Sequence, residues 1–336
     1  MNRRIIAVVA ACCLGVAALA VAGTRGGPAE GASRPEQVRL VLQWEPQAQF
    51  AGYYAAAEQG YYRDHGLDVE IMSGGPGIDP IAELRSGRAE FATSFLSGAM
   101  TAAEEGEPLV CVSQIVNRSN LLLVARRGAV ADRDALDGQR VSLWGTSFQA
   151  AYLGYFSTAD VEPELVPQYY TVNLFLRGGV TACAAMEYNE YHTILQAGVN
   201  PDELTTFSLR EAGFDFPEDG VYTLASTQRR SPGLCREFAA ATLEGWQYCR
   251  DNPEKAVTMV MRRAQAEHVP TNRAHQDWML EYVLRAVYPG ENDSWQPGVL
   301  SRVDYERTRA IMIGEGQIAG APSYERFVAP EARGAP

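Results

Sequence analysis

Short apolar runs alternate with helical patterns along much of the chain. The first unit has a β-like run at 38–43, a helical pattern at 50–65 and a second β-like run at 67–72. Asp79-Pro80 then opens a helix, because a capping side chain precedes a proline at the first helical position. Strands that alternate with helices at this spacing predict βαβ units and a mainly parallel sheet, which is an α/β fold.

The alternation continues, stops at a polar stretch near 132–138 and then restarts. The further predicted strands are 89–93, 109–115, 121–125, 140–144, 165–170, 182–186 and 220–226. From Ser231 onward the pattern is almost entirely helical. We therefore expect two α/β lobes with C-terminal helices, and crossovers near 126–139 and 220–228 that form a hinge. A cleft between two such lobes is a common site for a small ligand.

The length agrees with two domains. A single core rarely grows beyond roughly 250–300 residues, and the chain has 336 residues. We expect residues 38–126 and 221–320 to form the first lobe, residues 127–220 the second lobe, and residues 321–336 a C-terminal tail.

The N-terminal segment is typical of an export signal. A short positive segment precedes an uncharged, mostly apolar run that ends in the small residues Ala20-Val21-Ala22. We expect a signal peptide at residues 1–22 and a flexible leader at 23–37. Two alternatives stay open, namely an uncleaved membrane anchor and a lipoprotein acylated at Cys12. All three place the folded chain outside the cytoplasm, in a periplasm or at the cell surface.

Charge and cysteine content exclude several classes of partner. The formal net charge of −12 argues against nucleic acid or anionic lipid, since both attract clustered Lys and Arg. Beyond the apolar N-terminal run the cysteines are Cys111, Cys183, Cys235 and Cys249. None forms a CxxC, and no Cys/His cluster has metal-ligand spacing, so we expect neither a metal nor a cofactor. Buried thiols are the simplest interpretation of Cys111 and Cys183, Cys235 and Cys249 are too far apart on one predicted helix to bridge each other, and the disulfide state otherwise stays open.

No catalytic motif is present. The chain lacks GxSxG, HExxH, a Walker loop and a dinucleotide fingerprint. Each of its histidines fits a structural or surface role: His65, His192, His268 and His275. The glycine-rich loop at 74–77 has no nearby lysine, which favours an ordinary turn over a phosphate cradle. We therefore expect a protein without enzymatic activity.

Two segments place aromatic and polar side chains where predicted strands end. Trp44 follows the first strand, and Tyr188-Asn189-Glu190 follows the strand at 182–186. The carboxyl ends of parallel strands face the cleft of such folds. Trp44 either stacks on a flat ligand ring or packs beneath its own loop. Glu190 either accepts hydrogen bonds from a ligand amine or is an ordinary acid at the start of a helix.

At these residues the chain resembles a known family. Trp44-Glu45-Pro46, Glu58-Gln59-Gly60-Tyr61-Tyr62, Gly66-Leu67-Asp68-Val69 and Tyr188-Asn189-Glu190 resemble the SsuA/thiamin-pyrimidine-synthase-like family of ABC transporter substrate-binding proteins. The resemblance spans residues 38–315 and is strongest to the branch that binds formylaminopyrimidine-type thiamin precursors. It implies a two-lobed, periplasmic-binding-protein-like (type II) fold.

The resemblance also implies roles for individual residues. Trp44 and Tyr188 become candidates for stacking on an aminopyrimidine, and Glu190 for recognising its amine. Asn189 is expected to orient a group or to hydrogen-bond. The remaining candidates are Ser94 and Ser97 as polar contacts, and Gly145 and Thr146 as a turn that presents backbone N–H groups.

Departures from the family pattern leave the identity of the ligand open. Glu45 stands where threonine is more usual, Gln47 or Gln49 replaces an asparagine, and Thr181 replaces an aspartate. A flat heterocycle such as a thiamin-precursor aminopyrimidine is expected, with riboflavin, sulfonate or nitrate as alternatives. An anionic ligand favours Arg or Lys at the rims, where none is evident.

The implied function is that of an exported receptor, monomeric by default, which hands a small molecule to an ABC permease. A thiamin-pyrimidine synthase of the same family is the enzymatic alternative. It would require a reactive lysine, a donor histidine and a Cys-rich segment, and the chain has no Cys-rich segment. A receptor that feeds a signalling partner instead of a permease also stays open.

Overall fold

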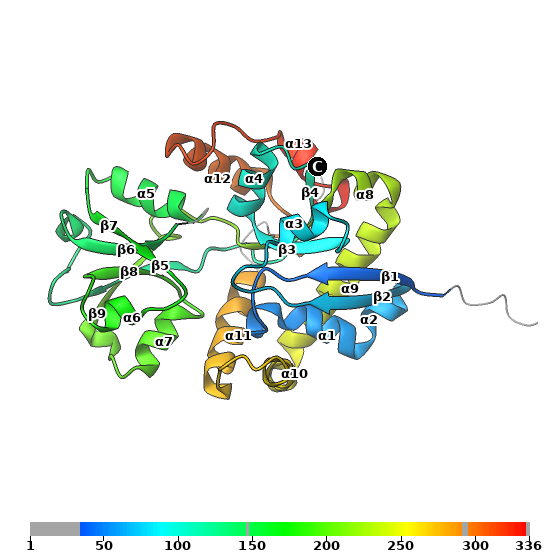
Figure 1. The fold of residues 1–336 in the computed structure, drawn as a ribbon, viewed down its shortest axis with the longest axis horizontal. Helices are drawn as coiled ribbons and strands as arrows, with labels where there is room; N and C mark the ends of the chain where they lie inside the picture. Colours follow the sequence, from blue (N-terminus) through cyan, green and yellow to red (C-terminus); the bar gives the residue numbers. More distant parts are fainter. Residues whose placement is uncertain (1–33, 146–147, 291–294, 334–336) are drawn as a thin grey trace, which may run out of the picture. The chain divides into compact units, whose positions relative to one another are not determined.

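The computed structural model describes residues 34–145, 148–290 and 295–333 (Figure 1). Two five-stranded sheets organise the body that begins at Pro35. The predicted signal peptide, Cys12 and most of the predicted leader lie outside the described residues, as does Thr146. No helix in the described ranges is long and apolar enough to cross a membrane.

The first sheet has the strand order β2-β1-β3-β10-β4. Strand β1 pairs in parallel with β2 and β3, whereas β10 runs antiparallel to both β3 and β4. The strands are β1 Glu36–Val41, β2 Leu67–Met72, β3 Phe91–Phe95, β4 Leu109–Gln114 and β10 Asp219–Leu224. The helices between these strands are η1 Ala48–Phe50, α1 Ala51–Gln59, α2 Tyr61–Asp64, α3 Pro80–Arg85 and α4 Leu96–Glu104.

The second sheet has the order β7-β6-β8-β5-β9, with β6 parallel to β7 and β8. Strand β5 runs antiparallel to β8 and β9. The strands are β5 Leu121–Arg126, β6 Arg140–Trp144, β7 Glu164–Gln168, β8 Ala182–Met186 and β9 Leu204–Ser208. Its helices are η2 Asp134–Leu136, α5 Gln149–Ser157, α6 Asn173–Leu176, α7 Glu190–Gln196 and η3 Pro201–Glu203.

Side-chain alternation along β5 shows how this sheet is buried on both faces. Leu121 and Leu123 belong to the larger hydrophobic core, whereas Leu122 and Val124 belong to a smaller core on the opposite face. Successive strand residues point to opposite faces, so a continuous apolar run such as this one serves two cores.

The crossings between the sheets differ from the sequence prediction. The chain passes from β4 to β5 through residues 115–120 and from β9 to β10 through residues 209–218. The predicted crossovers near 126–139 and 220–228 are therefore wrong. Strand β5 belongs to the second sheet, although the predicted first lobe extended to residue 126. The polar stretch at 132–138 misled the prediction, because it is a surface connection within the second sheet.

Two further differences are local. The single helix predicted at 50–65 is broken, because Gly60 adopts φ 89°, a left-handed conformation in which glycine is the favoured residue. Strand β9 was not predicted. It pairs only with β5 at the edge of the sheet, and its short Leu-Thr-Thr-Phe-Ser sequence carries little pattern of its own.

The helical C-terminal region packs on the first sheet and its helices. It comprises α8 Ala225–Arg230, α9 Pro232–Asp251, α10 Pro253–Ala266, α11 Arg273–Val287, α12 Arg302–Gly314, α13 Tyr324–Phe327 and η4 Pro330–Ala332. The predicted stripe of α9 is buried at Leu234, Phe238 and Ala241. All four cysteines of the described residues are buried and unbridged, which agrees with the interpretation of Cys111 and Cys183 as buried thiols.

Two glycines let α1 and α9 approach at backbone distance. A Cβ atom on Gly245 would lie 2.1 Å from the carbonyl oxygen of Gly52. A Cβ on Gly52 would lie 2.3 Å from the buried Trp246 ring. Real Cβ atoms do not reach such distances, so this close approach, which holds η1 and the loop after β1 in place, depends on glycine.

Gly245→Ala should lower the free energy of unfolding by about 1–3 kcal/mol, because the added methyl overpacks the α1–α9 contact. Urea denaturation followed by circular dichroism measures this change. Gly233→Ala is the matched control on the same helix, since its added Cβ meets only the end of Arg236 at 3.8 Å. Equal stability of the two variants would contradict the packing argument.

Candidate ligand-binding site

A cavity of about 330 Å³ lies where the carboxyl ends of parallel strands from both sheets meet. From the first sheet it is lined by the end of β3 and by residues that follow β1. From the second sheet it is lined by the ends of β6 and β8 and by residues that follow β7 and β8. The lining residues are Gln43, Trp44, Gln47, Gln49, Ser94, Phe95, Gly98, Trp144, Phe148, Tyr170, Met186, Tyr188, Asn189 and Glu190.

Aromatic rings from the two sheets meet across this cavity. Trp44 lies 5.2 Å from Tyr170, centroid to centroid, with 44° between the ring planes. Phe95, at the end of β3, contacts Phe148 edge to face at 4.2 Å. Tyr170 is 62% exposed, so it lies at the opening of the cavity. These paired rings are in contact with each other and form an apolar surface against which a flat ligand can lie.

Glu190 supplies the charge of the cavity. Its Oε2 accepts a hydrogen bond of 2.9 Å from the backbone N–H of Met186, and its Oε1 accepts one of 3.0 Å from Asn189 Nδ2. Burial raises the pKa of this carboxyl, and the hydrogen bonds act in the opposite direction. No Arg, Lys or His occurs among the lining residues that the structure describes. The site therefore favours a hydrogen-bond donor or a cation over an anion.

A second polar group comes from the loop after β1. Gln43 Nε2 donates to Asp219 Oδ1 at 2.6 Å, and Gln49 Nε2 donates to Asp219 Oδ2 at 2.8 Å. The Gln43 Oε1 atom is buried without a hydrogen-bond partner in the described part of the chain. Gln43 lines the cavity, and this buried oxygen is the unsatisfied polar atom of its side chain.

Five of the sequence-predicted site residues meet in the cavity wall. They are Trp44, Ser94, Tyr188, Asn189 and Glu190. Ser97 and Gly145, by contrast, are not among the lining residues. Ser97 is buried on α4, and Gly145 is exposed in the loop after β6. Thr146 lies outside the described residues.

Sequence reasoning missed several lining residues. Trp144 ends β6 and Tyr170 follows β7, so the rule that identified Trp44 was sufficient to find both. Phe148 and Gln47 had no such signal, because their place in the wall depends on how two loops fold back.

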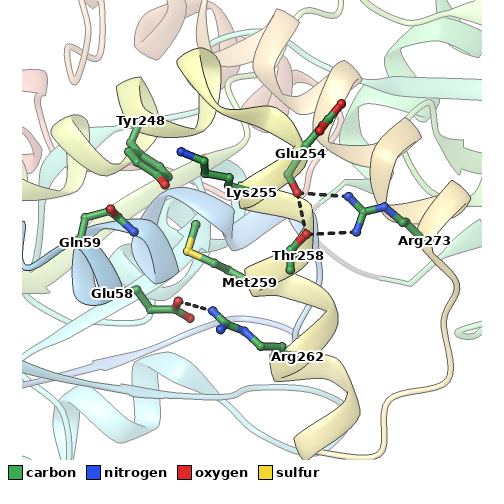
Figure 2. Close-up of a pocket in the computed structure, with 9 residues that line it drawn as sticks. All are labelled: Glu58, Gln59, Tyr248, Glu254, Lys255, Thr258, Met259, Arg262 and Arg273. Atoms are coloured by element: carbon green, nitrogen blue, oxygen red, sulfur yellow. Dashed lines mark hydrogen bonds and ion pairs between the residues drawn. The ribbon is translucent and has the colours of Figure 1, made fainter.

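A second cavity, of about 360 Å³, lies among α1, α9, α10 and α11 (Figure 2). Both of its arginines have hydrogen-bond partners within the lining. Arg262 pairs with Glu58, and Arg273 donates to the Glu254 carbonyl and to Thr258 Oγ1. It is built from helix surfaces instead of strand ends, and we assign no ligand to it.

Two buried acids lie beside the crossing at 209–218. Glu218 accepts from the backbone N–H and the side-chain amide of Asn120, so it ties the two crossings together. Burial raises the pKa of Glu218 to about 8 and that of Asp219 to about 7. Ionisation of either group inside the fold is therefore unfavourable.

Comparisons with known proteins identify a family and several relatives. A family model described as NMT1/THI5 like matches residues 47–256. The riboflavin-binding protein RibY of Chloroflexus aurantiacus is 25% identical over 269 residues, which cover 77% of this chain and 75% of the relative. The formylaminopyrimidine-binding protein of Halalkalibacterium halodurans is 23% identical over 287 residues, covering 80% and 85%.

Two other comparisons are with a solved structure and with an enzyme. The crystal structure of the periplasmic aliphatic sulphonate binding protein SsuA from Escherichia coli superposes with a TM-score of 0.66 at 14% identity, covering 90% of this chain and 94% of SsuA. This shows the same two-sheet fold. A 4-amino-5-hydroxymethyl-2-methylpyrimidine phosphate synthase of Saccharomyces cerevisiae is 21% identical over 136 residues, covering 40% of this chain and 37% of the synthase.

Between pH 6 and pH 9 the free energy of unfolding should fall as the pH rises. The ordinary pKa values of Glu218 and Asp219 are 4.5 and 3.8, and folding raises both. The stabilisation is thus complete below the ordinary values and is lost as the pH rises through the folded-state values. The slope is at most about 1.4 kcal/mol per pH unit for one group.

Urea denaturation at several pH values measures this slope. Glu218→Gln is the test variant, because glutamine cannot ionise, and its slope should be shallower than that of the wild type. A stability that is flat or rises across this range in the wild type would contradict the assignment.

Proposed function

The chain belongs to the NMT1/THI5-like family, and from that premise we propose that it is the solute-binding protein of an ABC importer. It acts outside the cytoplasm and has no enzymatic activity. Its ligand is a small flat heterocycle such as a thiamin-precursor aminopyrimidine, bound in the cavity between the two sheets.

The observation that carries this proposal is the combination of aromatic walls with one buried carboxylate. An aminopyrimidine has two apolar faces and an exocyclic amine at its edge. The faces suit Trp44 and Tyr188, and the amine suits the Glu190 carboxylate. Gln43 adds a polar side chain to the wall on the opposite sheet. Asn189 holds Glu190 Oε1, and Ser94 adds a hydroxyl at the end of β3.

A larger ring system such as riboflavin is the second candidate, and one observation favours it. The wall includes four aromatic residues besides Trp44 and Tyr188, namely Phe95, Trp144, Phe148 and Tyr170. This is more ring surface than a single pyrimidine covers. The relative RibY is named as a riboflavin-binding protein.

Sulfonate and nitrate are the weaker alternatives. An anion requires donors or cations to replace its water, and Glu190 would repel it. The described lining residues include no cationic side chain that offsets this repulsion. The likeness to SsuA therefore reflects the fold and carries no sulfonate specificity to this chain.

Binding without turnover is proposed over synthase chemistry. Residues 50–65 contain no lysine, and the chain has no Cys-rich segment. The synthase relative matches only 40% of the chain, whereas the two relatives named as binding proteins match 77% and 80%.

For transport, the permease must distinguish the ligand-bound protein from the ligand-free protein. We propose that the two sheets close around the ligand by bending at 115–120 and 209–218, and that the closed monomer docks on a membrane permease. The N-terminal run at 5–22 is proposed to direct export.

Glu190→Gln should weaken binding of formylaminopyrimidine by about tenfold to a hundredfold, because a charge-assisted hydrogen bond is replaced by a neutral one. Isothermal titration calorimetry on the purified protein measures the change, with riboflavin, taurine and nitrate titrated in parallel.

Tyr169→Ala is the matched control. Tyr169 is 75% exposed and does not line the cavity, so its loss should leave the affinity unchanged. Tight binding of taurine or nitrate, or equal affinities of the wild type and Glu190→Gln for every heterocycle tested, would contradict the proposed function.

A further inference from the structure

Helices α7 and α11 meet beside the cavity and connect the two sheets. Helix α7 follows β8 of the second sheet. Helix α11 is fixed to the first sheet's loop, because Gln276 Oε1 accepts a hydrogen bond of 2.7 Å from the backbone N–H of Ala48. From this anchored helix, His275 Nε2 lies 3.0 Å from Asn189 Oδ1, and Trp278 Nε1 donates to the Glu187 carbonyl at 3.0 Å.

A stack of rings extends this contact. His192 of α7 lies 4.6 Å from Trp278, centroid to centroid, with only 4° between the planes. The same ring lies 5.1 Å from His275 with 7° between the planes. Its Nδ1 atom is 2.8 Å from the Nδ1 atom of His275. We call His192, His275 and Trp278 the α7–α11 latch.

When both histidines are neutral, the hydrogen bonds admit one consistent arrangement of protons. Asn189 Nδ2 donates to Glu190 Oε1, so Asn189 Oδ1 must accept. His275 therefore carries its proton on Nε2 and donates to that oxygen. Neutral His275 then has a lone pair on Nδ1, and His192 donates to it from its own Nδ1. Two neutral histidines therefore satisfy every hydrogen bond in the series from His192 through His275 and Asn189 to Glu190.

We propose that His275 is a positioning residue of the binding site, and that the α7–α11 latch holds the two lobes together around the ligand. His275 fixes the amide of Asn189 so that its NH₂ group faces Glu190. The carboxylate is thereby held in the orientation that accepts a ligand donor. This inference rests on the proposed function, because it concerns the same cavity.

The latch makes ligand retention sensitive to acid. Burial lowers the pKa of His192 and lowers that of His275 to about 4, and His192 contributes to the second shift. When the lobes separate, both rings regain ordinary values near 6.5 and bind protons more readily. The contribution of the latch is therefore complete above about pH 6.5 and is lost as the pH falls from there toward about 4.

Other titratable groups surround the latch. On the side of α7 they are Glu187, Glu190 and Tyr191, and on α11 they are Arg273, Asp277 and Tyr282. Burial raises the pKa of Glu187 and of Glu190, so both carboxyls also take up protons in acid. A variant that changes only the histidine is needed to separate these contributions.

His275→Leu and His275→Gln provide that separation. Leucine removes the donor to Asn189, whereas the glutamine amide replaces the Nε2 donor without titrating. At pH 7.5, His275→Leu should weaken binding of formylaminopyrimidine or riboflavin by about tenfold, and His275→Gln should restore most of the affinity. Between pH 7.5 and 5, the affinity of His275→Gln should fall less than that of the wild type.

His65→Gln is the control for histidine titration in general. His65 lies after α2 and bonds Glu237 and Glu244, away from the cavity. Its substitution should leave the pH profile of binding unchanged. An acid profile of His275→Gln identical to that of the wild type, or equal weakening by the leucine and glutamine variants, would overturn the proposal.

Histidine NMR on the ligand-free protein separates this inference from the proposed function. The chain has only four histidines, so single substitutions assign each signal. If the rings of the latch are in contact in solution, His275 titrates well below 6.5 wherever the lobes are closed and returns toward 6.5 wherever they are apart. Titration of His275 near 6.5, both free and with riboflavin or formylaminopyrimidine present, would overturn the latch. Failure of both heterocycles to bind would overturn the proposed function instead.

Discussion

The cavity depends on the direction in which parallel strands run. In each sheet, parallel strands bring their carboxyl ends to one edge, and the chain must turn there before it can enter the next helix. The residues at those turns face the cavity in both sheets, which is why Trp44, Trp144, Tyr170 and Glu190 converge from segments far apart in the sequence. The antiparallel strands β5 and β10 connect the sheets and leave this edge intact.

The electrostatics of the cavity follow from the absence of a cationic side chain among the lining residues that the structure describes. A carboxylate in an apolar wall is costly unless something donates to it. In Glu190 the Met186 N–H and the Asn189 amide provide two donors, and lone pairs remain for a third. A ligand amine completes this set, and an anion does not. The same logic explains the buried carboxyl of Asp219, which accepts hydrogen bonds from the amides of Gln43 and Gln49.

Much of the fold and part of the site could be predicted from the sequence. Periodicity located most strands within two or three residues, because apolar runs and N-caps such as Asp79 are local signals. Crossings at 115–120 and 209–218 could not be located, because the membership of β5 in a sheet is decided by its partners β8 and β9. Strand ends predicted Trp44, Tyr188, Asn189 and Glu190, whereas the bond from His275 to Asn189 depends on the packing of two helices from different lobes.

A crystal structure of the protein grown with formylaminopyrimidine tests most directly whether a flat ligand is held between the two sheets. The account predicts the ring in the cavity, against Trp44 or Tyr188, with its amine within hydrogen-bond distance of Glu190. A ligand bound instead among α1, α9, α10 and α11, or in the cavity with no contact to Glu190, would contradict it.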